Sequence, residues 1–567
     1  MGLRTTSPLN IMPRKRNYPH PYIPELVEDL RQNRVSRREF LRTSTLLGLS
    51  ATAAYAIAGQ ITGEPLTPTA HAQAGKGGVL KIGIRVQEMT DPATFDWVPK
   101  SNVARQMVEY LTITGPDNVT RPYLAEKWQA SPDLKTWTLH LRKGITWSNG
   151  DPFNADDVVF NFKRWLDPKT GSSNLGLFAS MTDEITGADG KKTKKMTEGA
   201  VEKVDSHTVR LHLNRPELAI PENCYNYPTA IVHRSFEEWG KDLSKKPVGT
   251  GPYELAEFRV GERAVLKKRK APYWGGDVSL DEIHFIDLGD DRNAMVGALA
   301  SGQINYTWEL GIPQLDVVKS LPGAQLFEAV TAQTAVARMQ VTQKPFDNKK
   351  VRQALQACIN HGQVLQLAYR DKGVAGEDHH VAPIHPEYFK LPATKPDIDK
   401  AKALLKEGGH PGGIQLSIDC NNDAKWEIDA VQAMVEMWKP AGINVKINVV
   451  PGTQYWENWT KAPFGMTTWT HRPLGVMVLN LAYRSGVPWN ETKYNNPAFD
   501  KALDDAAGTL DVNERRKKME KVEKILQDDA IIMQPLWRSV FTAGSKTMHN
   551  LKMHPTLYYQ LNQVWVG

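Results

Sequence analysis

Residues 414–450 read IQLSIDC-NNDAK-WEIDAVQAMVEMW-KPAG-INVKINVV. The first and last runs, 414–420 and 443–450, are rich in apolar and β-branched residues and predict two strands. Between them, residues 426–438 have a helical period, and a Pro-Ala-Gly break ends the helix. The apolar face of that helix consists of Ile428, Val431, Val435 and Trp438. A strand, a helix and a second strand in this order form a parallel pair with a crossover, so this stretch predicts α/β architecture.

The same interleaving of strand and helix patterns occurs earlier in the chain. Residues 136–142 alternate between apolar and polar side chains, which predicts a half-buried strand. After a turn, Asn154 can cap the next helix. Asp156 and Asp157 in the first turn of that helix are stabilised by the positive end of the helix dipole. The buried stripe of this helix is expected to be Val158, Phe162 and Trp165.

The N-terminal region has the features of an export signal. It contains the sequence SRREFL at 36–41, a weakly apolar run from about 41 to 58, and Ala72-Gln73-Ala74. Adjacent arginines, such a run and a small-x-small site are typical of twin-arginine signals, so we predict that residues 1–74 are cleaved after Ala74 and that the mature protein is periplasmic. The run is too short and polar for a membrane span of about 20 residues. The alternative interpretation is an amphipathic N-terminal helix of a cytosolic protein.

Composition limits what the remaining 493 residues can do. They are enough for two or three domains, and they hold 61 basic and 58 acidic side chains. This near balance argues against nucleic acid as a partner. The three cysteines, Cys224, Cys358 and Cys420, match no metal motif. We expect small buried side chains without a redox role, while one disulfide between two of the three is an open alternative in an oxidising compartment.

Metal and catalytic motifs give no support for an enzyme. Asp378, His379, His380 and His385 could indicate nickel, because imidazole is a common ligand of transition metals. However, residues 372–386 contain glycine, proline and polar side chains, so a solvated loop is the better interpretation. The sequence contains no Gly-x-Ser-x-Gly, no His-Glu-x-x-His and no phosphate-binding glycine loop. We therefore expect neither catalysis nor a bound cofactor or metal.

A series of short motifs resembles one known family. These motifs are PYLAEKW (122–128), LRKGITWSNG (141–150), ADDV (155–158), GTGPY (249–253), YW (273–274), SGQI (301–304), FDNKKVRQAL (346–355), AKALLKEGG (401–409) and YNNPAFD (494–500). In order and spacing they are similar to the extracellular solute-binding proteins of the oligopeptide, dipeptide and nickel class, family 5. The likeness covers nearly all of residues 75–567. Its specificity comes from the ordered combination of motifs.

The resemblance implies an α/β, two-lobed periplasmic-binding-protein fold of type II, the large peptide-binding class, with an extra inserted subdomain. In such a fold, closure of two hinged lobes buries a ligand between them. The implied ranges are 75–117, 227–330 and 540–567 for lobe I, 118–226 for its inserted subdomain and 331–539 for lobe II. Hinge candidates are residues 331–337 and 539–545, which are rich in small or polar residues.

One departure from the family pattern concerns the ligand. Family members often carry an aspartate in lobe II shortly after a Gly/Ala-Trp pair, and in peptide binders this aspartate pairs with the amino terminus of the ligand. Here Trp469 keeps the aromatic wall, but Arg472 occupies the aspartate position, with His471 beside it. A guanidinium pairs with a carboxylate or phosphate, so we expect an anionic group on the ligand. The alternative is that Arg472 belongs to a structural or surface ion pair.

Other residues that the resemblance places in the cleft are mostly aromatic. Aromatic walls bury a large area with few rotatable bonds, which suits a ligand site. Trp456 and Trp459 are instead attributed to the core, since aromatics at helical spacing usually reflect packing. The further ligand-contact candidates are Tyr306, Trp308, Thr470, Tyr483, Arg484 and Trp489.

The resemblance also implies a function. We expect a monomeric periplasmic receptor of an ABC importer, which captures a peptide or peptide-sized solute and delivers it to membrane permease subunits energised by a cytoplasmic ATPase. The ligand remains open among peptides, opines, sugars and other solutes. Two further classes remain as alternatives: an exported enzyme of unknown reaction, and a chaperone-like periplasmic binder.

Overall fold

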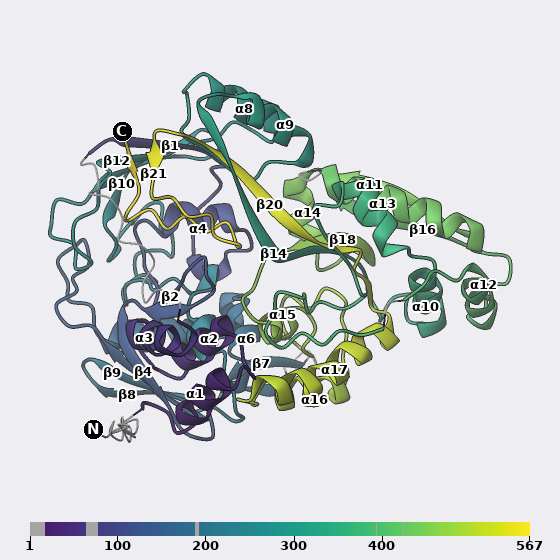
Figure 1. The fold of residues 1–567 in the computed structure, drawn as a ribbon, viewed down its shortest axis with the longest axis horizontal. Coiled ribbons are helices and arrows are strands. Elements are labelled where there is room, and N and C mark those ends of the chain that lie inside the picture. The colour runs from purple at the N-terminus through teal and green to yellow at the C-terminus, as the bar shows by residue number, and fades with distance from the viewer. Residues whose placement is uncertain (1–17, 64–76, 187–191, 393, 423–424) are drawn as a thin grey trace, which may run out of the picture.

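The computed structural model describes residues 18–63, 77–186, 192–392, 394–422 and 425–567. A twelve-stranded sheet runs through the molecule, and its two longest strands, β14 (Ala324–Met339) and β20 (Leu536–Ser545), lie antiparallel at its centre. Figure 1 shows this pair crossing from one half of the molecule to the other. Both segments expected as hinges, 331–337 and 539–545, lie on these two strands.

The ranges expected for lobe I supply one side of this sheet. Its strands are β1 (Val79–Gly83), β10 (Tyr253–Arg259), β11 (Arg263–Lys268), β12 (Glu282–Ile286) and β13 (Tyr306–Thr307), in the order β10-β11-β12-β1-β13. β13 pairs with β20 and so joins this side to the centre. The accompanying helices are α4 (Val98–Ala104), α8 (Arg292–Ala300) and α9 (Leu315–Ser320). Beyond β20, the chain ends with β21 (Met548–His549) and β22 (Trp565–Val566).

The range expected for lobe II supplies the other side. Its strands in sheet order from β14 are β18 (Phe464–Trp469), β16 (Ile414–Asn421) and β17 (Ile443–Val450), while β15 (Gly373–Ala375) and β19 (Ile532–Met533) pair with β20 and β14. The helices are α10 (Lys349–Ala357), α11 (His361–Tyr369), α12 (Ile398–Glu407), α13 (Lys425–Trp438), α14 (Gly452–Asn458), α15 (Gly475–Ala482), α16 (Pro497–Ala507) and α17 (Val512–Asp529).

The strand-helix-strand prediction for residues 414–450 is confirmed. β16 and β17 pair in parallel along their whole length, from Ile414 opposite Ile443 to Asn421 opposite Val450, and α13 connects them. Trp438, on the predicted apolar face, is fully buried, and its indole nitrogen donates a 2.9 Å hydrogen bond to the Leu355 carbonyl. The crossover helix is therefore anchored to α10 as well as to its own sheet.

Residues 118–226 contain a separate four-stranded sheet. Its strands are β4 (Ala125–Ala130), β5 (Thr136–Leu141), β9 (Thr208–His212) and β8 (Val201–Asp205), in that order. Helix α5 (Ala155–Trp165) starts at Asn154, which caps it reciprocally with Asp157 as the sequence predicts. The same region and its border also include β2 (Thr112–Thr114), β3 (Thr120–Pro122), β6 (Thr182–Thr186), β7 (Lys192–Met196), α6 (Asn174–Leu177) and α7 (Ile220–Asn223).

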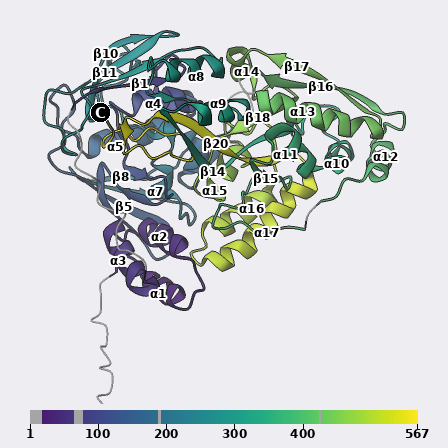
Figure 2. The same cartoon turned by 45° about the horizontal axis from the view of Figure 1, so that its top comes forward.

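Three N-terminal helices pack against this folded body. They are α1 (Ile23–Arg31), α2 (Arg37–Leu46) and α3 (Ala51–Thr62), and Figures 1 and 2 show them beside the inserted sheet and next to α17. Ser36 and Glu39 of the arginine motif form a reciprocal capping box at the start of α2. The predicted cleavage site after Ala74 lies outside the described residues. No helix in the described residues has both the length and the apolar character needed to cross a bilayer.

The histidine segment corrects one prediction. Residues 378–382 and His385 are buried, whereas a solvated loop was expected there. The reason is that each imidazole has a hydrogen-bond partner, which offsets the cost of burying it. His379 Nε2 lies 3.0 Å from a Glu377 oxygen, His380 Nδ1 lies 2.9 Å from the Tyr483 hydroxyl, and His385 Nε2 lies 3.0 Å from the Arg472 carbonyl.

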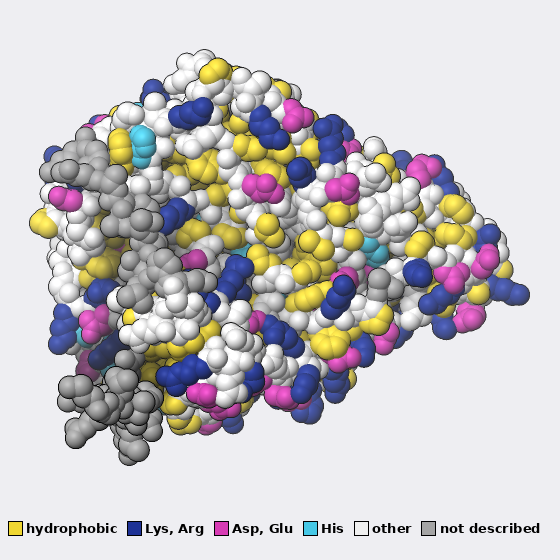
Figure 3. Space-filling view, in the orientation of Figure 1, with side chains coloured by type: hydrophobic (Ala, Val, Ile, Leu, Met, Phe, Trp, Pro, Cys, Tyr) yellow, Lys and Arg dark blue, Asp and Glu magenta, His cyan; other side chains and the backbone are white. Residues whose placement is uncertain are grey.

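Three other expectations concern metal binding, the cysteines and surface charge. No group of three or more potential metal ligands converges anywhere in the described residues. Cys224, Cys358 and Cys420 are all buried and free in the structure, and their burial agrees with the interpretation that they are small buried side chains. Figure 3 shows Lys and Arg side chains interspersed with Asp and Glu over the face in view, as the near balance of charge predicts.

Candidate functional site

Two adjoining cavities lie between the segments expected for lobe I and those expected for lobe II. The larger has a volume of about 270 Å³ and the narrower about 50 Å³. Both are lined by residues of lobe I, such as Trp97, and residues of lobe II, such as Trp456 and Thr470. Because they share these walls, we treat the two cavities as one cleft. Its position at the junction of two lobes is the usual place for a ligand that is enclosed by domain closure.

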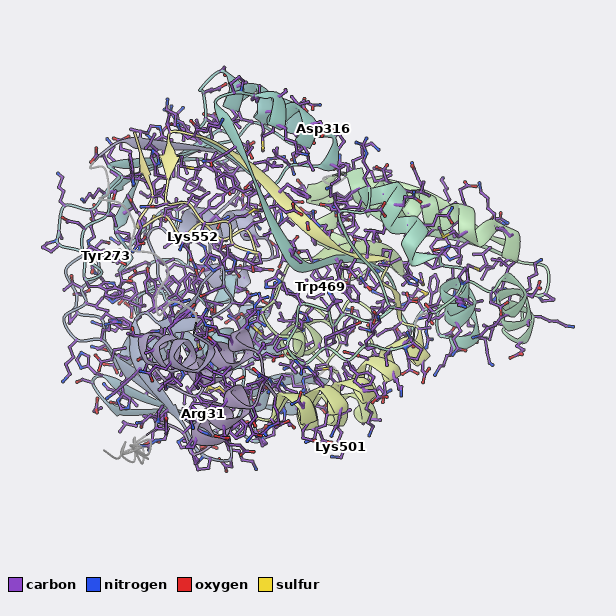
Figure 4. All side chains as sticks on the ribbon, viewed as in Figure 1. Arg31, Tyr273, Asp316, Trp469, Lys501 and Lys552 are labelled. Atoms are coloured by element: carbon purple, nitrogen blue, oxygen red, sulfur yellow. The ribbon has the colours of Figure 1, made fainter. Side chains whose placement is uncertain are left out.

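Strand β18 carries Trp469 into this cleft. Trp469 is the last residue of the strand and stands opposite Thr334 of the central strand β14. Figure 4 shows its position in the middle of the molecule, beside the crossing pair of strands. The backbone of β14 therefore determines where this aromatic wall lies relative to lobe I.

A cluster of tryptophans forms the wall of the narrow cavity. The rings of Trp459, Trp469 and Trp489 meet edge to face, with centroids 5.9–6.0 Å apart in each pair. Trp456 packs against Trp459 in the same manner, and Tyr227 of lobe I lies 6.0 Å from Trp489. Edge-to-face packing restrains each ring through its neighbours, so the wall is preformed before any ligand binds.

A buried ion pair orients Trp469. Its indole nitrogen donates a hydrogen bond of 2.9 Å to Glu491 Oε1, and the second Glu491 oxygen accepts hydrogen bonds from Thr467 Oγ1 at 2.6 Å and Arg338 Nε at 2.7 Å. Burial raises the pKa of the Glu491 carboxyl, whereas the Arg338 charge and the hydrogen bonds act in the opposite direction. Glu491 and Arg338 are thus buried supports of the cleft wall.

Arg472 closes one end of the narrow cavity. Its Nη1 donates hydrogen bonds to the Thr470 side chain and to the His471 carbonyl, and its guanidinium carbon lies 5.3 Å from the centre of the Tyr227 ring. No carboxylate of the described residues forms an ion pair with Arg472, and its Nε is buried without a hydrogen-bond partner. Within the described residues, Arg472 is therefore a buried cation without an ion-pair partner, and the one carboxylate that lines the same cavity, Asp96, is paired with Lys100.

The larger cavity has a charged floor where lobe I meets the central strands. Arg538 of β20 forms an ion pair with Glu309, whose two oxygens both accept from it, and donates to Gln333 Oε1 at 2.8 Å. Its guanidinium also lies 4.8 Å from the centre of the Trp426 ring. Burial lowers the pKa of Arg538, but the charges of Glu309 and Tyr369 and the hydrogen bonds to both together outweigh this effect, so the net pKa is raised. This pair is electrically balanced, unlike Arg472.

The structure brings together five of the nine predicted contact residues. Trp308 lines the larger cavity, Thr470 lines both, and Trp469, Arg472 and Trp489 line the narrow one.

The other four predicted contact residues line neither cavity. The Tyr306 hydroxyl is turned into the core of lobe I, where it lies 2.6 Å from Thr542 Oγ1. Tyr483 is committed to His380, and Arg484 forms an ion pair of 2.5 Å with Asp504. His471 points away from the cavity, with Nδ1 accepting a 3.0 Å hydrogen bond from the Ala332 amide. Each of these polar groups bonds a protein partner outside the cleft.

Several cleft residues escaped the sequence analysis. Trp456 was attributed to the core, yet it lines both cavities. Trp97, Tyr227, Glu309 and Arg538 were not singled out at all, although they line the cleft from four distant parts of the chain. The only local signal was aromatic or charged character, which many other positions share.

Comparisons with known proteins agree with this architecture. The family model for bacterial extracellular solute-binding proteins, family 5, matches residues 120–477. The periplasmic oligopeptide-binding protein OppA of Haemophilus influenzae is 28% identical over 80% of this chain and 86% of that protein.

Solved structures show the same fold. The structure of H. influenzae OppA with the peptide RPPGFSPFR covers 87% of this chain and all of that chain, at 24% identity and a TM-score of 0.77. AgaA of A. tumefaciens R10 in complex with agropinic acid covers 86% of this chain and 99% of that chain, at 22% identity and a TM-score of 0.76. These matches confirm the predicted fold class. The chain belongs to the bacterial extracellular solute-binding proteins of family 5.

Proposed function

We propose that this protein is the periplasmic receptor of an ABC importer and that it captures a peptide or peptide-sized solute carrying an anionic group. The lobes close on the solute, and the receptor passes it unaltered to the membrane permease, which a cytoplasmic ATPase energises. Family membership supports the binding role, and the similar proteins are described as binding oligopeptides in one case and agropinic acid in another.

The observation that carries the anionic preference is the state of Arg472. A buried guanidinium without a paired carboxylate has lost its hydration and has no opposite charge to compensate for that loss. A carboxylate or phosphate of the ligand would supply the opposite charge. The tryptophan wall beside it offers apolar area for the rest of the solute. In a peptide binder with aspartate at this place, the same end of the cleft would attract an ammonium group instead.

Export is the second part of the proposal. The arginine motif and the run that follows it support transport of the folded chain into the periplasm, where we propose that the protein acts as a monomer.

Native mass spectrometry of the receptor purified from its own periplasm tests the proposal. We expect a bound, unmodified solute with at least one acidic group, and small-angle scattering should show a more compact molecule with that solute than without it. A solute that is always cationic at this end, or one that leaves as a chemically altered product, would contradict the proposal.

A further inference from the structure

The N-terminal helices are attached to lobe I and to its inserted subdomain. Residues 18–63 are called the clasp below. Trp128 donates an indole hydrogen bond of 2.8 Å to the Leu46 carbonyl, and the Tyr55 hydroxyl donates one of 2.6 Å to Asp117. At Gly48, where φ is +89°, an added Cβ would lie 2.5 Å from the Trp128 carbonyl oxygen. The clasp thus approaches this subdomain so closely that a side chain at Gly48 would not fit.

The same helices are attached to lobe II through α17. Arg516 of α17 forms an ion pair with Glu39, which is the capping residue of α2. At the other end of the clasp, the Tyr22 hydroxyl lies 3.4 Å from an Asp511 oxygen at the start of α17. Three helices that follow one another in sequence therefore contact both lobes.

Arg42 lies between the two lobes at the centre of this contact. With the Asn118 amide oxygen facing the clasp, Arg42 Nη2 donates a 2.7 Å hydrogen bond to it, while the other end of that amide lies 3.1 Å from His471 Nε2. The charge of Arg42 also acts on two buried carboxylates, Glu222 of the inserted subdomain and Glu387 of lobe II. Arg42 is thereby connected, through the Asn118 side-chain amide, to His471, which directly precedes Arg472 in the sequence.

Apolar packing follows the same route. One core cluster contains side chains of the clasp, of the inserted subdomain and of lobe II. The buried members include Ile23, Leu26, Phe40 and Leu47 from the clasp, Trp128 and Leu134 from the subdomain, and Val512 and Met519 from α17.

We infer that in the uncleaved chain, before the predicted removal of residues 1–74, residues 18–63 are a clasp that ties the two lobes together and holds the cleft closed while they are docked. A hinge motion that separates lobe I from lobe II must break either the α2–α17 contacts or the contacts with Trp128 and Asp117, since the clasp is attached to both. The clasp is a segment of this same chain, and the surface that it covers spans the junction of the two lobes. The inference concerns lobe motion and does not depend on which solute the cleft takes.

The distance between the lobes in the full chain tests this inference. Spin labels on Lys245→Cys of lobe I and Lys501→Cys of lobe II are suitable, because these side chains are 83% and 75% exposed and the three native cysteines are buried. Double electron–electron resonance would measure the distance between the two labels with the native clasp, with Arg42→Lys and with Arg42→Glu. Hydrogen exchange of the α2 amides reports in the same samples whether the clasp is docked.

We expect one narrow distance for the native chain and for Arg42→Lys, which keeps the charge. Arg42→Glu places a third carboxylate beside Glu222 and Glu387, so the α2 amides should lose protection and a longer distance should appear, with at least a tenfold rise in the open population. Loss of α2 protection with an unchanged interlobe distance would overturn the inference.

A second set of variants at the partly exposed edge of the clasp covers the case in which Arg42→Glu does not fold. Glu39→Lys or Arg516→Glu alone brings like charges together, and the double exchange restores an opposite pair. Each single change should lengthen the interlobe distance and the double exchange should return it to the native value. Equal distances in all four proteins would overturn the inference.

Discussion

The indole nitrogen of Trp469 donates a 2.9 Å hydrogen bond to Glu491, a carboxylate that is itself held by the buried Arg338. The aromatic wall of the cleft therefore depends on an ion pair whose two residues line neither cavity. This arrangement connects the stability of the protein with the geometry of its binding site, and it leads to the first of four predictions.

Glu491→Gln keeps the shape of the side chain but leaves the Arg338 charge buried without its partner. We expect the free energy of unfolding to fall by roughly 3 kcal/mol. Urea unfolding followed by tryptophan fluorescence measures this change. The double variant Glu491→Gln, Arg338→Met should recover part of the loss, because it removes both charges. If the double variant is less stable than the single one, the ion pair is not the cause.

Arg472→Met removes the unpaired guanidinium while keeping an apolar side chain of similar length. We expect an anionic solute to lose about 2–5 kcal/mol of binding free energy and an uncharged analogue to bind almost unchanged. Isothermal titration with the two solutes measures the difference. Arg472→Lys is the matched control, since it keeps the charge and should lose less. An equal loss for both solutes would contradict the charge-pairing argument.

Substitutions of two aromatic residues, Trp456 and Tyr306, are expected to have different effects, the first on solute affinity and the second on stability. Trp456 lines both cavities, so Trp456→Ala should weaken solute binding by more than about 1 kcal/mol. Tyr306→Phe removes a buried hydroxyl that bonds Thr542, and should cost about 1 kcal/mol of stability while leaving affinity unchanged. Titration and thermal unfolding of both variants would show whether the structure assigns these two aromatics correctly.

Glu222 predicts a pH dependence of stability. Burial raises the pKa of this carboxyl to about 8, with Arg42 acting in the opposite direction, whereas in the unfolded chain its value is near 4.5. Between these values the folded state binds more protons than the unfolded state. The contribution of Glu222 to stability is therefore lost as pH rises, at no more than about 1.4 kcal/mol per pH unit.

The matched variant for this test is Glu222→Gln, which stays neutral at every pH. Relative to it, the native protein should become progressively less stable in urea unfolding from pH 5 to pH 8. Parallel stability curves for the two proteins would show that Glu222 does not titrate in this range.

Much of the local structure could be predicted because its causes are local. The β16–α13–β17 unit follows from the apolar periodicity of residues 414–450, and the start of α5 follows from Asn154 and its acidic neighbours. The histidines of residues 378–385 show the limit of this reasoning. They are polar and adjacent to a glycine-containing stretch, yet Glu377, Tyr483 and the Arg472 carbonyl allow them to be buried. Those partners lie as far as a hundred residues away in sequence.

The sequence by itself determined the family, the α/β class and the replacement of the expected aspartate by Arg472, since these depend on residue identity and order along the chain. Only the tertiary structure decided that Trp97 and Trp456 face the cleft while Tyr306 and Arg484 do not. The physical reason is that side chains from distant segments compete for places in the core and in the cleft wall. That competition takes place between segments that meet only when the two lobes have folded and come together.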